Sequence, residues 1–278
     1  MSDPLLIVDN LEVTFPGRSG VTRAVRNASF TLGRERLGVV GESGSGKTTM
    51  GRALLGLLPR NATVTADRMS YEGKNLLTCT EHDWQTLRGR RMSMVMQDPK
   101  YSLNPVKTVG RQIAETALLH LKIGRAEAKR RALAMLDAVQ IRDPALVAGL
   151  FPHQLSGGMG QRVMIAMMLI AEPDLLIADE PTSALDVTVQ NEVLRILDDL
   201  VRDRGMGLIM ISHNLTMVSS FCDRVLIMYA GRIVEECKAS ELQNASHPYT
   251  RALVAATPSL DVRRSELATV TRDPEWLK

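Results

Sequence analysis

The stretch "RLGVVGESGSGKTTMGRALLGLL", residues 36–58, decides the fold of this chain. It begins with a short apolar run that predicts a strand, and it ends in "KTTMGRALLGLL", whose apolar residues have helical spacing. The glycine-rich segment between them, "GESGSGKT" (41–48), fits the pattern G-x-x-x-x-G-K-[ST] of a phosphate-binding loop. A strand, such a loop and a helix in this order predict an α/β protein that binds a phosphorylated ligand.

The phosphate-binding loop supplies the first candidate site residues. Its glycines let backbone N–H groups turn toward phosphate oxygens, and the helix start adds the positive end of its dipole. Lys47 is expected to reach the β- and γ-phosphates of a nucleotide, Thr48 to ligate Mg²⁺ and Thr49 to contact the α-phosphate. A glycine-rich turn without a ligand is the alternative, and the flanking strand and helix argue against it. The nucleotide-binding candidates in this segment are Gly41, Ser43, Gly44, Ser45, Gly46, Lys47, Thr48 and Thr49.

The rest of the chain alternates between strands and helices. Runs 5–15 and 24–32 have the pattern of strands, and "RVLIMYAGRIVEE" predicts a hairpin that turns at Ala230–Gly231. "DVTVQNEVLRILDDLVRDR" predicts a helix. Strands that alternate with helices imply an α/β core with a largely parallel sheet. Further apolar strands are predicted at 91–98, 174–180 and 207–213, and a helical stretch at about 107–148.

Composition narrows the class of protein. The chain has 278 residues, of which 45% are hydrophobic and 23% charged, as in one or two globular domains, and a net charge of +3 is too small to indicate nucleic acid. Three widely spaced cysteines suggest neither a disulfide framework nor a zinc site, and they fit a reducing cytoplasm. The N-terminus does not have the pattern of a signal peptide, and the longest apolar run (163–171) is too short to span a membrane. Any membrane role is therefore expected to come through a partner.

Two adjacent carboxylates follow a predicted strand in "LLIADE" (175–180). The apolar residues place Asp179 at the carboxyl end of this strand, where open α/β sheets bind their ligands. Asp179 is expected to hold Mg²⁺ through water, and Glu180 to accept a proton from an attacking water molecule. A solvated turn is the alternative for such a pair, and the phosphate-binding loop upstream argues against it.

The segment "LSGGM" (155–159) resembles the signature motif of ATP-binding cassette (ABC) ATPases, and the resemblance covers about residues 5–258. In that family the signature lies at a helix N-terminus and binds the γ-phosphate of ATP held by the phosphate loop of a second subunit. The resemblance assigns this role to Ser156, Gly157 and Gly158, where a plain helix cap is the alternative. Since the chain has one loop and one signature, it implies a nucleotide-sandwiched dimer, with itself or with a related ATPase.

Further positions match the same family. Gln97 in "MVMQDP" matches the Q-loop glutamine, which senses Mg²⁺ and the γ-phosphate and faces the transmembrane partner, and His213 in "IMISHN" matches the switch histidine, which contacts the γ-phosphate. "SALD" (183–186) matches the D-loop, whose Asp186 communicates across the dimer, and Phe15 lies where the family places an aromatic residue under the adenine. A packed strand residue is the alternative for Phe15.

The resemblance also implies a fold: an α/β P-loop NTPase (RecA-like) core with an antiparallel β portion and an inserted α-helical subdomain. The expected ABC ATPase domain is 1–240, and a short C-terminal tail follows at 241–278. Within the domain, 1–88 and 166–240 are expected to form the core with its β subdomain, and 89–165 the helical subdomain with the Q-loop and signature. The implied catalytic residues are Lys47, Gln97, Glu180 and His213, and the implied Mg²⁺ residues are Thr48, Gln97 and Asp179.

Three stretches resemble the ATPases of oligopeptide, dipeptide and nickel importers in particular: 97–115, 159–190 and "HPYTRALVAATP" (247–258). This implies ATP and Mg²⁺ as cofactors, with two permease subunits, a second ATPase and an extracytoplasmic binding protein as partners, and no nucleic acid. The implied location is the cytoplasmic face of the bacterial inner membrane. The tail lacks the cysteine cluster and Pro-rich segment of longer peptide-importing members, which favours a nickel or metallophore cargo.

The expected mechanism is that two ATP molecules close the dimer and that their hydrolysis reopens it, and the Q-loop surface passes this movement to the permease. Glu180 activates the water, while Lys47, Mg²⁺ and His213 stabilise the developing charge. The alternatives are a soluble ABC ATPase acting on nucleic acid or ribosomes, an ABC exporter, a nucleotide-binding regulator and a small-molecule kinase. The sequence has neither a long coiled-coil insertion nor a second cassette, and a kinase would not explain "LSGGM".

Overall fold

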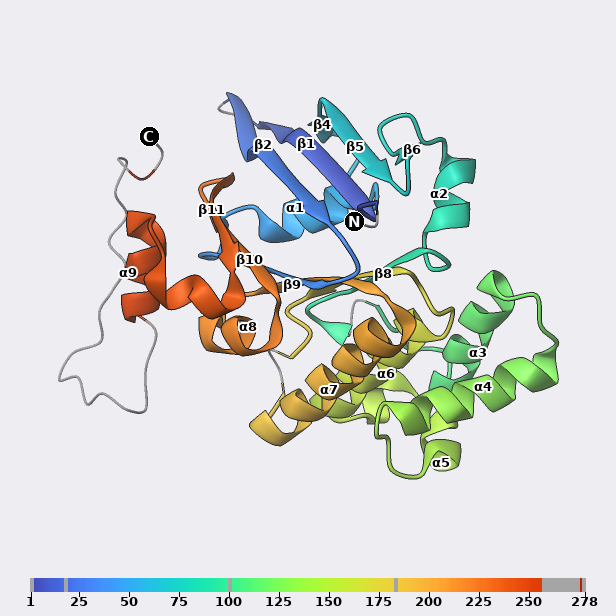
Figure 1. The fold of residues 1–278 in the computed structure, drawn as a ribbon. Coiled ribbons are helices and arrows are strands. Elements are labelled where there is room, and N and C mark those ends of the chain that lie inside the picture. Colours follow the sequence, from blue (N-terminus) through green and yellow to red (C-terminus); the bar gives the residue numbers. More distant parts are fainter. Residues whose placement is uncertain (1–2, 18–19, 100–101, 183–184, 257–275, 277–278) are drawn as a thin grey trace. The chain divides into compact units, whose positions relative to one another are not determined.

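The computed structural model describes residues 3–17, 20–99, 102–182, 185–256 and 276 (Figure 1). By compactness the chain divides into two units, Met1–Thr80 with Ile209–Lys278, and Glu81–Leu208. This division rests on compactness alone, so the subdomain boundaries expected from the sequence, 89–165 within 1–240, stay a prediction.

The first unit contains an antiparallel sheet in which β1 pairs with β2, β4 and β5. Along β1 the register shifts between Val8 and Leu11, where Asn10 has a φ of 51°. This bulge inserts one residue, so that Leu11 and Val13 return to the buried face that Val8 occupies. The strands of this sheet are β1 (Leu6–Gly17), β2 (Gly20–Leu32), β4 (Thr63–Thr65), β5 (Arg68–Tyr71) and β6 (Lys74–Asn75).

A second group of strands follows the order β11-β10-β3-β9. β3 is parallel to β10, and β10 and β11 form the predicted hairpin, with φ of 45° at Ala230 and 87° at Gly231. β9 is buried along its whole length, which explains its unbroken apolar run. These strands are β3 (Arg36–Val40), β9 (Gly207–Ser212, whose first two residues precede the unit boundary), β10 (Arg224–Tyr229) and β11 (Arg232–Lys238).

The helix after the glycine-rich loop, α1 (Lys47–Leu54), begins where the sequence predicts and ends four residues earlier than the predicted residue 58. Gly56 has a φ of 60°, and the N–H groups of Gly56 and Leu57 donate to the carbonyls of Ala53 and Arg52 at 3.0 and 2.9 Å. Such bonds around a left-handed glycine end a helix. The other helical elements of the unit are α8 (Leu215–Phe221), the 3-10 segment η3 (Ala239–Asn244) and α9 (Pro248–Ala256).

The second unit combines two parallel strands with six α-helices among its described residues (Figure 1). β7 and β8 pair from Met92 with Leu175 to Val95 with Ala178, and both strands are buried throughout. α2 was not predicted from the sequence. The elements are α2 (Glu81–Leu87), β7 (Met92–Val95), α3 (Val109–His120), α4 (Arg125–Ala138), α5 (Pro144–Ala148), the 3-10 segment η2 (Pro152–Gln154), α6 (Gly157–Leu169), β8 (Leu175–Asp179) and α7 (Val187–Arg204).

The described helices and the three cysteines bear on the expected membrane role and redox state. Within the described ranges, no helix is both long and apolar enough to cross a lipid bilayer. Cys79, Cys222 and Cys237 form no disulfide bond, and burial raises the pKa of the Cys222 thiol to about 12. Cys222 is therefore a core side chain rather than a reactive thiol.

Candidate active site

The phosphate-binding loop lies between β3 and α1, and its shape depends on glycine. Gly41, Gly44 and Gly46 have φ of 154°, 81° and 101°. A Cβ on Gly41 would lie 2.1 Å from the carbonyl oxygen of Met228, and one on Gly46 would lie 2.3 Å from that of Ala24. These two glycines thus let the loop approach the backbones of β10 and β2, which any larger residue would prevent.

Lys47 is held by the loop that precedes it. Its side chain is largely buried, with the whole residue 7% exposed. The Nζ atom donates to the carbonyl oxygens of Gly41 at 2.8 Å and Glu42 at 2.7 Å, and it lies 3.4 Å from the hydroxyl of Ser45. A buried ammonium needs such acceptors, and here they fix its position at the start of α1.

The start of α1 lacks a capping side chain. Its N-cap residue is Gly46, in the left-handed conformation, and no acidic residue occupies the first turn. The first N–H groups of a helix have no intrahelical acceptor, and the helix dipole places positive charge there. Thr48 and Thr49 follow within this first turn, so the predicted phosphate-binding residues share one anion-binding geometry.

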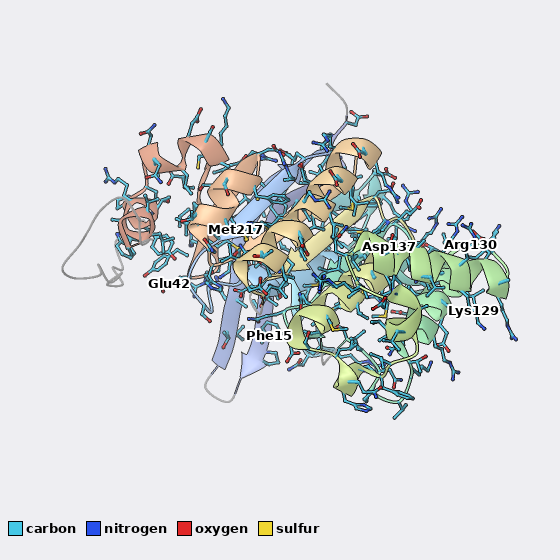
Figure 2. The ribbon with its side chains drawn as sticks, turned by 90° about the horizontal axis from the view of Figure 1, so that it is seen from below. Phe15, Glu42, Lys129, Arg130, Asp137 and Met217 are labelled. Carbon is cyan, nitrogen blue, oxygen red and sulfur yellow. The ribbon has the colours of Figure 1, made fainter. Side chains whose placement is uncertain are left out.

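The β10–β11 turn supports the loop from one side. The N–H of Gly231 donates to the Ser45 carbonyl at 3.0 Å, and the Gly231 carbonyl accepts from the N–H of Arg26 at 2.7 Å. A hollow of about 280 Å³ opens here. It is lined by Glu42, labelled in Figure 2, together with Ser43, Gly44, Ser45, Tyr229 and Ala230.

Phe15 and His213 are the remaining predicted residues of the first unit. Phe15 lies near the end of β1 opposite Thr22 (Figure 2), and its side chain is only half-buried. A strand phenylalanine that merely packed in the core would be buried, so this position leaves a ring face for a ligand. His213 is exposed directly after β9, and Asn214 next to it caps α8 by accepting from the N–H of Met217 at 3.0 Å.

In the second unit the two predicted carboxylates end β8. Asp179 is 3% exposed, whereas Glu180 is half-buried and has a φ of 48°. A left-handed glutamate costs conformational energy and turns the chain sharply at the strand end. The amide Nε2 of Gln97 lies 3.4 Å from the Glu180 carboxylate, so the structure brings these two predicted residues together.

The signature forms the start of α6. Ser156 is its N-cap, and the hydroxyl accepts from the N–H of Met159 at 3.3 Å. Ser156 and Gly157 are exposed, and a Cβ on Gly157 would meet no atom within 4 Å. A Cβ on Gly158 would lie 3.3 Å from Leu185, so this glycine meets the segment before α7.

Asp186 caps α7 by accepting from the N–H of Val189 at 3.0 Å. The two residues at 183–184, which belong to the predicted D-loop, lie outside the described residues. The structure thus gives Asp186 a local role, the cap, and its predicted communication across a dimer stays a prediction.

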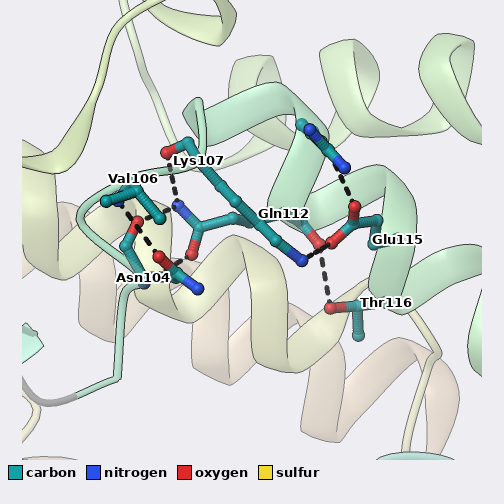
Figure 3. Close-up of polar contacts among 7 residues, drawn as sticks. Asn104, Val106, Lys107, Gln112, Glu115 and Thr116 are labelled. Atoms are coloured by element: carbon teal, nitrogen blue, oxygen red, sulfur yellow. Dashed lines mark hydrogen bonds and ion pairs between the residues drawn. The ribbon is translucent and has the colours of Figure 1, made fainter.

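The segment after Gln97 is fixed by a buried amide (Figure 3). Gln112 of α3 donates to the carbonyls of Asn104 and Lys107 at 3.0 and 2.9 Å and accepts from the N–H of Asn104 at 2.8 Å. Lys107 and Glu115 form an ion pair at 2.6 Å, and hydrogen bonds from Lys107 and then Arg111 hold the pKa of the Glu115 carboxyl below its usual value. The sequence indicates this segment only through its family resemblance, and it does not reveal the structural role of Gln112.

Tyr249 of α9 is a second residue that the sequence did not reveal. It is fully buried, and its hydroxyl accepts from the N–H of Glu42 in the phosphate-binding loop at 3.1 Å. The stretch "HPYTRALVAATP" was informative only as a family resemblance, because a contact across 207 positions leaves no periodicity in the sequence.

Comparisons with known proteins show the family to which this chain belongs. The profile of the ABC transporter family matches residues 25–183. The probable peptide ABC transporter ATP-binding protein y4tR of Sinorhizobium fredii is 46% identical over 276 residues, 98% of this chain and 82% of the relative. The oligopeptide transport ATP-binding protein OppD of Salmonella typhimurium is 44% identical over 272 residues, 97% of this chain and 81% of the relative.

Solved structures confirm the predicted fold class. A dimeric ATP-binding cassette in a post-hydrolysis state, bound to ADP and Pi, has a TM-score of 0.77 at 24% identity, over 84% of this chain and 98% of that one. The cbiO1 subunit of the cbiONQ ABC transporter complex of Clostridium perfringens has a TM-score of 0.73 at 25% identity, over 87% and 92%. The fold is therefore the P-loop NTPase core with an antiparallel β portion and an inserted helical subdomain.

Proposed function

The chain belongs to the ABC transporter family as an ATP-binding subunit, and from this premise we propose that it hydrolyses ATP to drive an importer of peptides. One observation carries the proposal: the uncapped start of α1 beside a buried lysine that two carbonyls hold in place. A helix start without a capping side chain, the helix dipole and a fixed ammonium together favour a polyphosphate.

The first unit is proposed to bind the nucleotide. Lys47 contacts the β- and γ-phosphates, and the half-buried ring of Phe15 stacks on the adenine. Thr48 offers a hydroxyl oxygen, Asp179 a carboxylate and Gln97 an amide oxygen, which are the hard ligands that Mg²⁺ prefers. When bound, Mg²⁺ neutralises charge on the phosphate oxygens. The remaining phosphate contacts come from Gly41, Ser43, Gly44, Ser45, Gly46 and Thr49.

Glu180 is proposed as the general base. Its carboxylate is half-buried at a strand end and lies 3.4 Å from the Gln97 amide, which can orient it toward the attacking water. Exposed His213 contacts the γ-phosphate, and Lys47 stabilises the charge that develops on it.

A second ATPase chain is proposed to complete each site. Ser156 and Gly157 are exposed at the start of α6, so they are open to a ligand that another subunit holds. Because the chain has one loop and one signature, a dimer with itself or with a related ATPase provides two complete sets.

The permease is proposed to dock on the helical face of the second unit. A cavity of about 800 Å³ opens among α3, α4 and α5, with Ala114, Leu118 and Leu133 in its wall. Three cations and one carboxylate, Arg111, Arg125, Lys129 and Glu115, also line it, so it fits an amphipathic segment with acidic residues. Lys129 extends from α4 in Figure 2. Val106, 78% exposed on the segment that Gln112 fixes, is a further exposed apolar side chain of the same unit.

Peptides are the proposed cargo class, because the relatives compared are named for peptide transport at 44–46% identity over almost the whole chain. Nickel or a metallophore is the second candidate cargo. The proposed location is the cytoplasmic face of the inner membrane, where an extracytoplasmic binding protein would deliver the cargo to two permease subunits.

The reaction is tested by Glu180→Gln. We expect ATP turnover, measured as phosphate release, to fall by about two to four orders of magnitude, as loss of a general base does. Glu172→Gln is the matched control, since Glu172 also has a positive φ, 55°, in the same unit. Turnover of Glu180→Gln within a few-fold of the control would contradict the assignment.

The partners are tested by co-purification from source-cell membranes with tagged Glu180→Gln, ATP and Mg²⁺, followed by mass spectrometry. We expect two permeases, a second ATPase and a peptide-binding protein, whereas a nickel-binding protein would select the second cargo class. Val106→Asp should lose the permeases, and Val21→Asp, at an equally apolar position 68% exposed in the other unit, should keep them. Ribosomal or DNA-repair partners without any membrane protein would overturn the transport proposal.

A further inference from the structure

Tyr249 holds one peptide group of the phosphate-binding loop. Its hydroxyl accepts from the N–H of Glu42 at 3.1 Å, and that N–H shares a peptide group with the carbonyl of Gly41. The Gly41 carbonyl accepts from Nζ of Lys47 at 2.8 Å. Because a peptide group is planar, a bond that fixes its N–H also fixes the direction of its carbonyl. Tyr249 and Lys47 are therefore linked through a single rigid group.

The position of the Tyr249 ring is itself fixed by aromatic packing. The ring lies 4.5 Å from that of Tyr229 and 5.3 Å from that of Trp276, and Trp276 packs edge-on against Tyr229 at 5.5 Å. Tyr229 directly precedes the Ala230–Gly231 turn that bonds to Ser45. The aromatic cluster is thus joined to the loop at two points, through the Tyr249 hydroxyl and through the turn that follows Tyr229.

The segment that carries Tyr249 is also tied to β11. The carboxylate of Glu235 accepts from the N–H and hydroxyl of Ser246 at 2.7 and 2.8 Å and from the N–H of His247 at 3.3 Å. Burial alone would raise the pKa of Glu235, but the groups of Thr250, Ser246 and His247 around it lower the pKa below its ordinary value. The carboxylate is therefore charged at neutral pH and anchors the start of α9.

A buried tyrosine also packs as a hydrophobic side chain, and packing alone would need only its ring. The hydroxyl has a more specific consequence. It accepts a hydrogen bond from the N–H of Glu42 in the loop. Loss of this acceptor in a half-buried loop would let the Gly41–Glu42 peptide group reorient. Reorientation would withdraw one of the two carbonyls that hold Lys47.

We propose that Tyr249 is a positioning residue for Lys47, so that the C-terminal segment 246–250 sets the affinity of the phosphate-binding loop for ATP. The proposal rests on the proposed ATP-binding function of the chain. Tyr249 does not touch the ligand; it acts through the Gly41–Glu42 peptide group. Strong hydrogen bonds on both sides of one peptide polarise each other, which reinforces the link.

The test is the dissociation constant of ATP with Mg²⁺, measured by titration calorimetry. Tyr249→Phe removes only the hydroxyl, and we expect it to raise this constant by about five-fold, as loss of one hydrogen bond does. Tyr71→Phe is the matched control, the same change at a buried tyrosine on β5 of the same unit, and should stay within about two-fold of the wild type. Thermal unfolding of both variants checks that the fold is kept.

A double-mutant cycle separates positioning from packing. Lys47→Arg keeps the charge but not the geometry of the ammonium, so adding Tyr249→Phe should weaken ATP binding by less than about two-fold further. Equal losses in both backgrounds, or equal losses for Tyr249→Phe and Tyr71→Phe, would overturn the positioning role. If the wild-type protein binds no ATP, the proposed function itself fails, and with it this inference.

Discussion

Two helices begin at glycine-rich segments, α1 at the phosphate-binding loop and α6 at the signature. They differ in whether a side chain caps their first N–H groups. At α1 the N-cap is Gly46 and no side chain caps the helix. At α6 the hydroxyl of Ser156 accepts from the N–H of Met159. The start of α1 is enclosed by the loop and by β10, whereas the start of α6 is exposed.

Under the proposed function, these two helix starts bind phosphate in two different ways. The loop of α1 keeps a fixed cation, Lys47, beside uncapped N–H groups, so it suits a ligand held within one chain. The start of α6 is stable on its own because it is capped, and it can present bare glycine to a ligand brought by another chain.

The largest effect is expected at Lys47. Lys47→Ala removes the fixed charge at α1, and ATP turnover should fall by about 10²–10³-fold, the usual loss for one preorganised electrostatic group. Lys74 is an exposed lysine on β6 of the same unit, and Lys74→Ala should leave ATP turnover, measured as phosphate release, unchanged. A loss of similar size in both variants would mean that general surface charge, not the α1 site, attracts the nucleotide.

Glycine replacements in the loop should separate backbone strain from close contact. Gly44→Ala places alanine at φ 81° with open space around its Cβ, which costs about 1–2 kcal/mol of unfolding free energy. Gly46→Ala adds overlap with the Ala24 carbonyl, so its total cost should be about 3–5 kcal/mol. Urea unfolding of both variants measures the difference, and equal costs would show that the loop can move away from β2.

The cap at α6 should contribute to stability independently of nucleotide. Ser156→Ala should lower the free energy of unfolding by about 1 kcal/mol, and Ser156→Gly by only a few tenths, because glycine is tolerated at an N-cap. Denaturant unfolding without ATP is the measurement. If both variants have the unfolding free energy of the wild type, the hydrogen bond from the Met159 N–H to the Ser156 hydroxyl does not stabilise α6. The cap would then not distinguish α6 from α1 in stability.

The smallest effect is expected below the loop, where Arg36 and Asp223 join the starts of β3 and β10. The Asp223 carboxylate accepts from the N–H of Arg36 at 2.8 Å and from its guanidinium at 2.6 Å. Burial would raise the pKa of Asp223, but these bonds lower it below its ordinary value. Asp223→Asn should therefore cost about 1 kcal/mol or less, since the pair is partly open to water.

The pH dependence checks this prediction. A lowered carboxyl pKa contributes stability above the unfolded value of about 3.9, and that contribution is lost as the pH falls through the folded pKa. The difference in unfolding free energy between wild type and Asp223→Asn should be constant above about pH 5 and shrink below about pH 4. A difference that grows in acid would contradict the assignment.

The local parts of the molecule could be predicted from the sequence, and the distant contacts could not. The strand, loop and helix around 36–58 follow from apolar runs and glycines that are neighbours in the chain. α1 ended early because the left-handed Gly56 closed it, a choice that apolar spacing does not record. The half-burial of Phe15 also depends on strand pairing rather than on its neighbours in sequence.

The same distinction holds for the candidate site. The contact of Gln97 with Glu180 joins two motifs that were each visible, although their pairing needed the structure. Gln112 and Tyr249 belong to no motif of their own. Gln112 is a buried amide inside a helical run, and Tyr249 lies in the C-terminal segment that was expected to be a short tail. The roles of the predicted site residues stay predictions until the variants above are measured.

The hydrogen bond between Glu42 and Tyr249 has a consequence for how the protein is made. Its two ends are 207 residues apart, so a ribosome adding about 5–20 residues per second releases the second roughly 10–40 seconds after the first. Throughout that interval the nascent phosphate-binding loop has its glycines but lacks the hydrogen bond to Tyr249. A chain interrupted before α9 would contain every nucleotide motif but lack the Tyr249 hydrogen bond to the phosphate-binding loop, so under the proposed role of Tyr249 it would bind ATP more weakly than the finished chain.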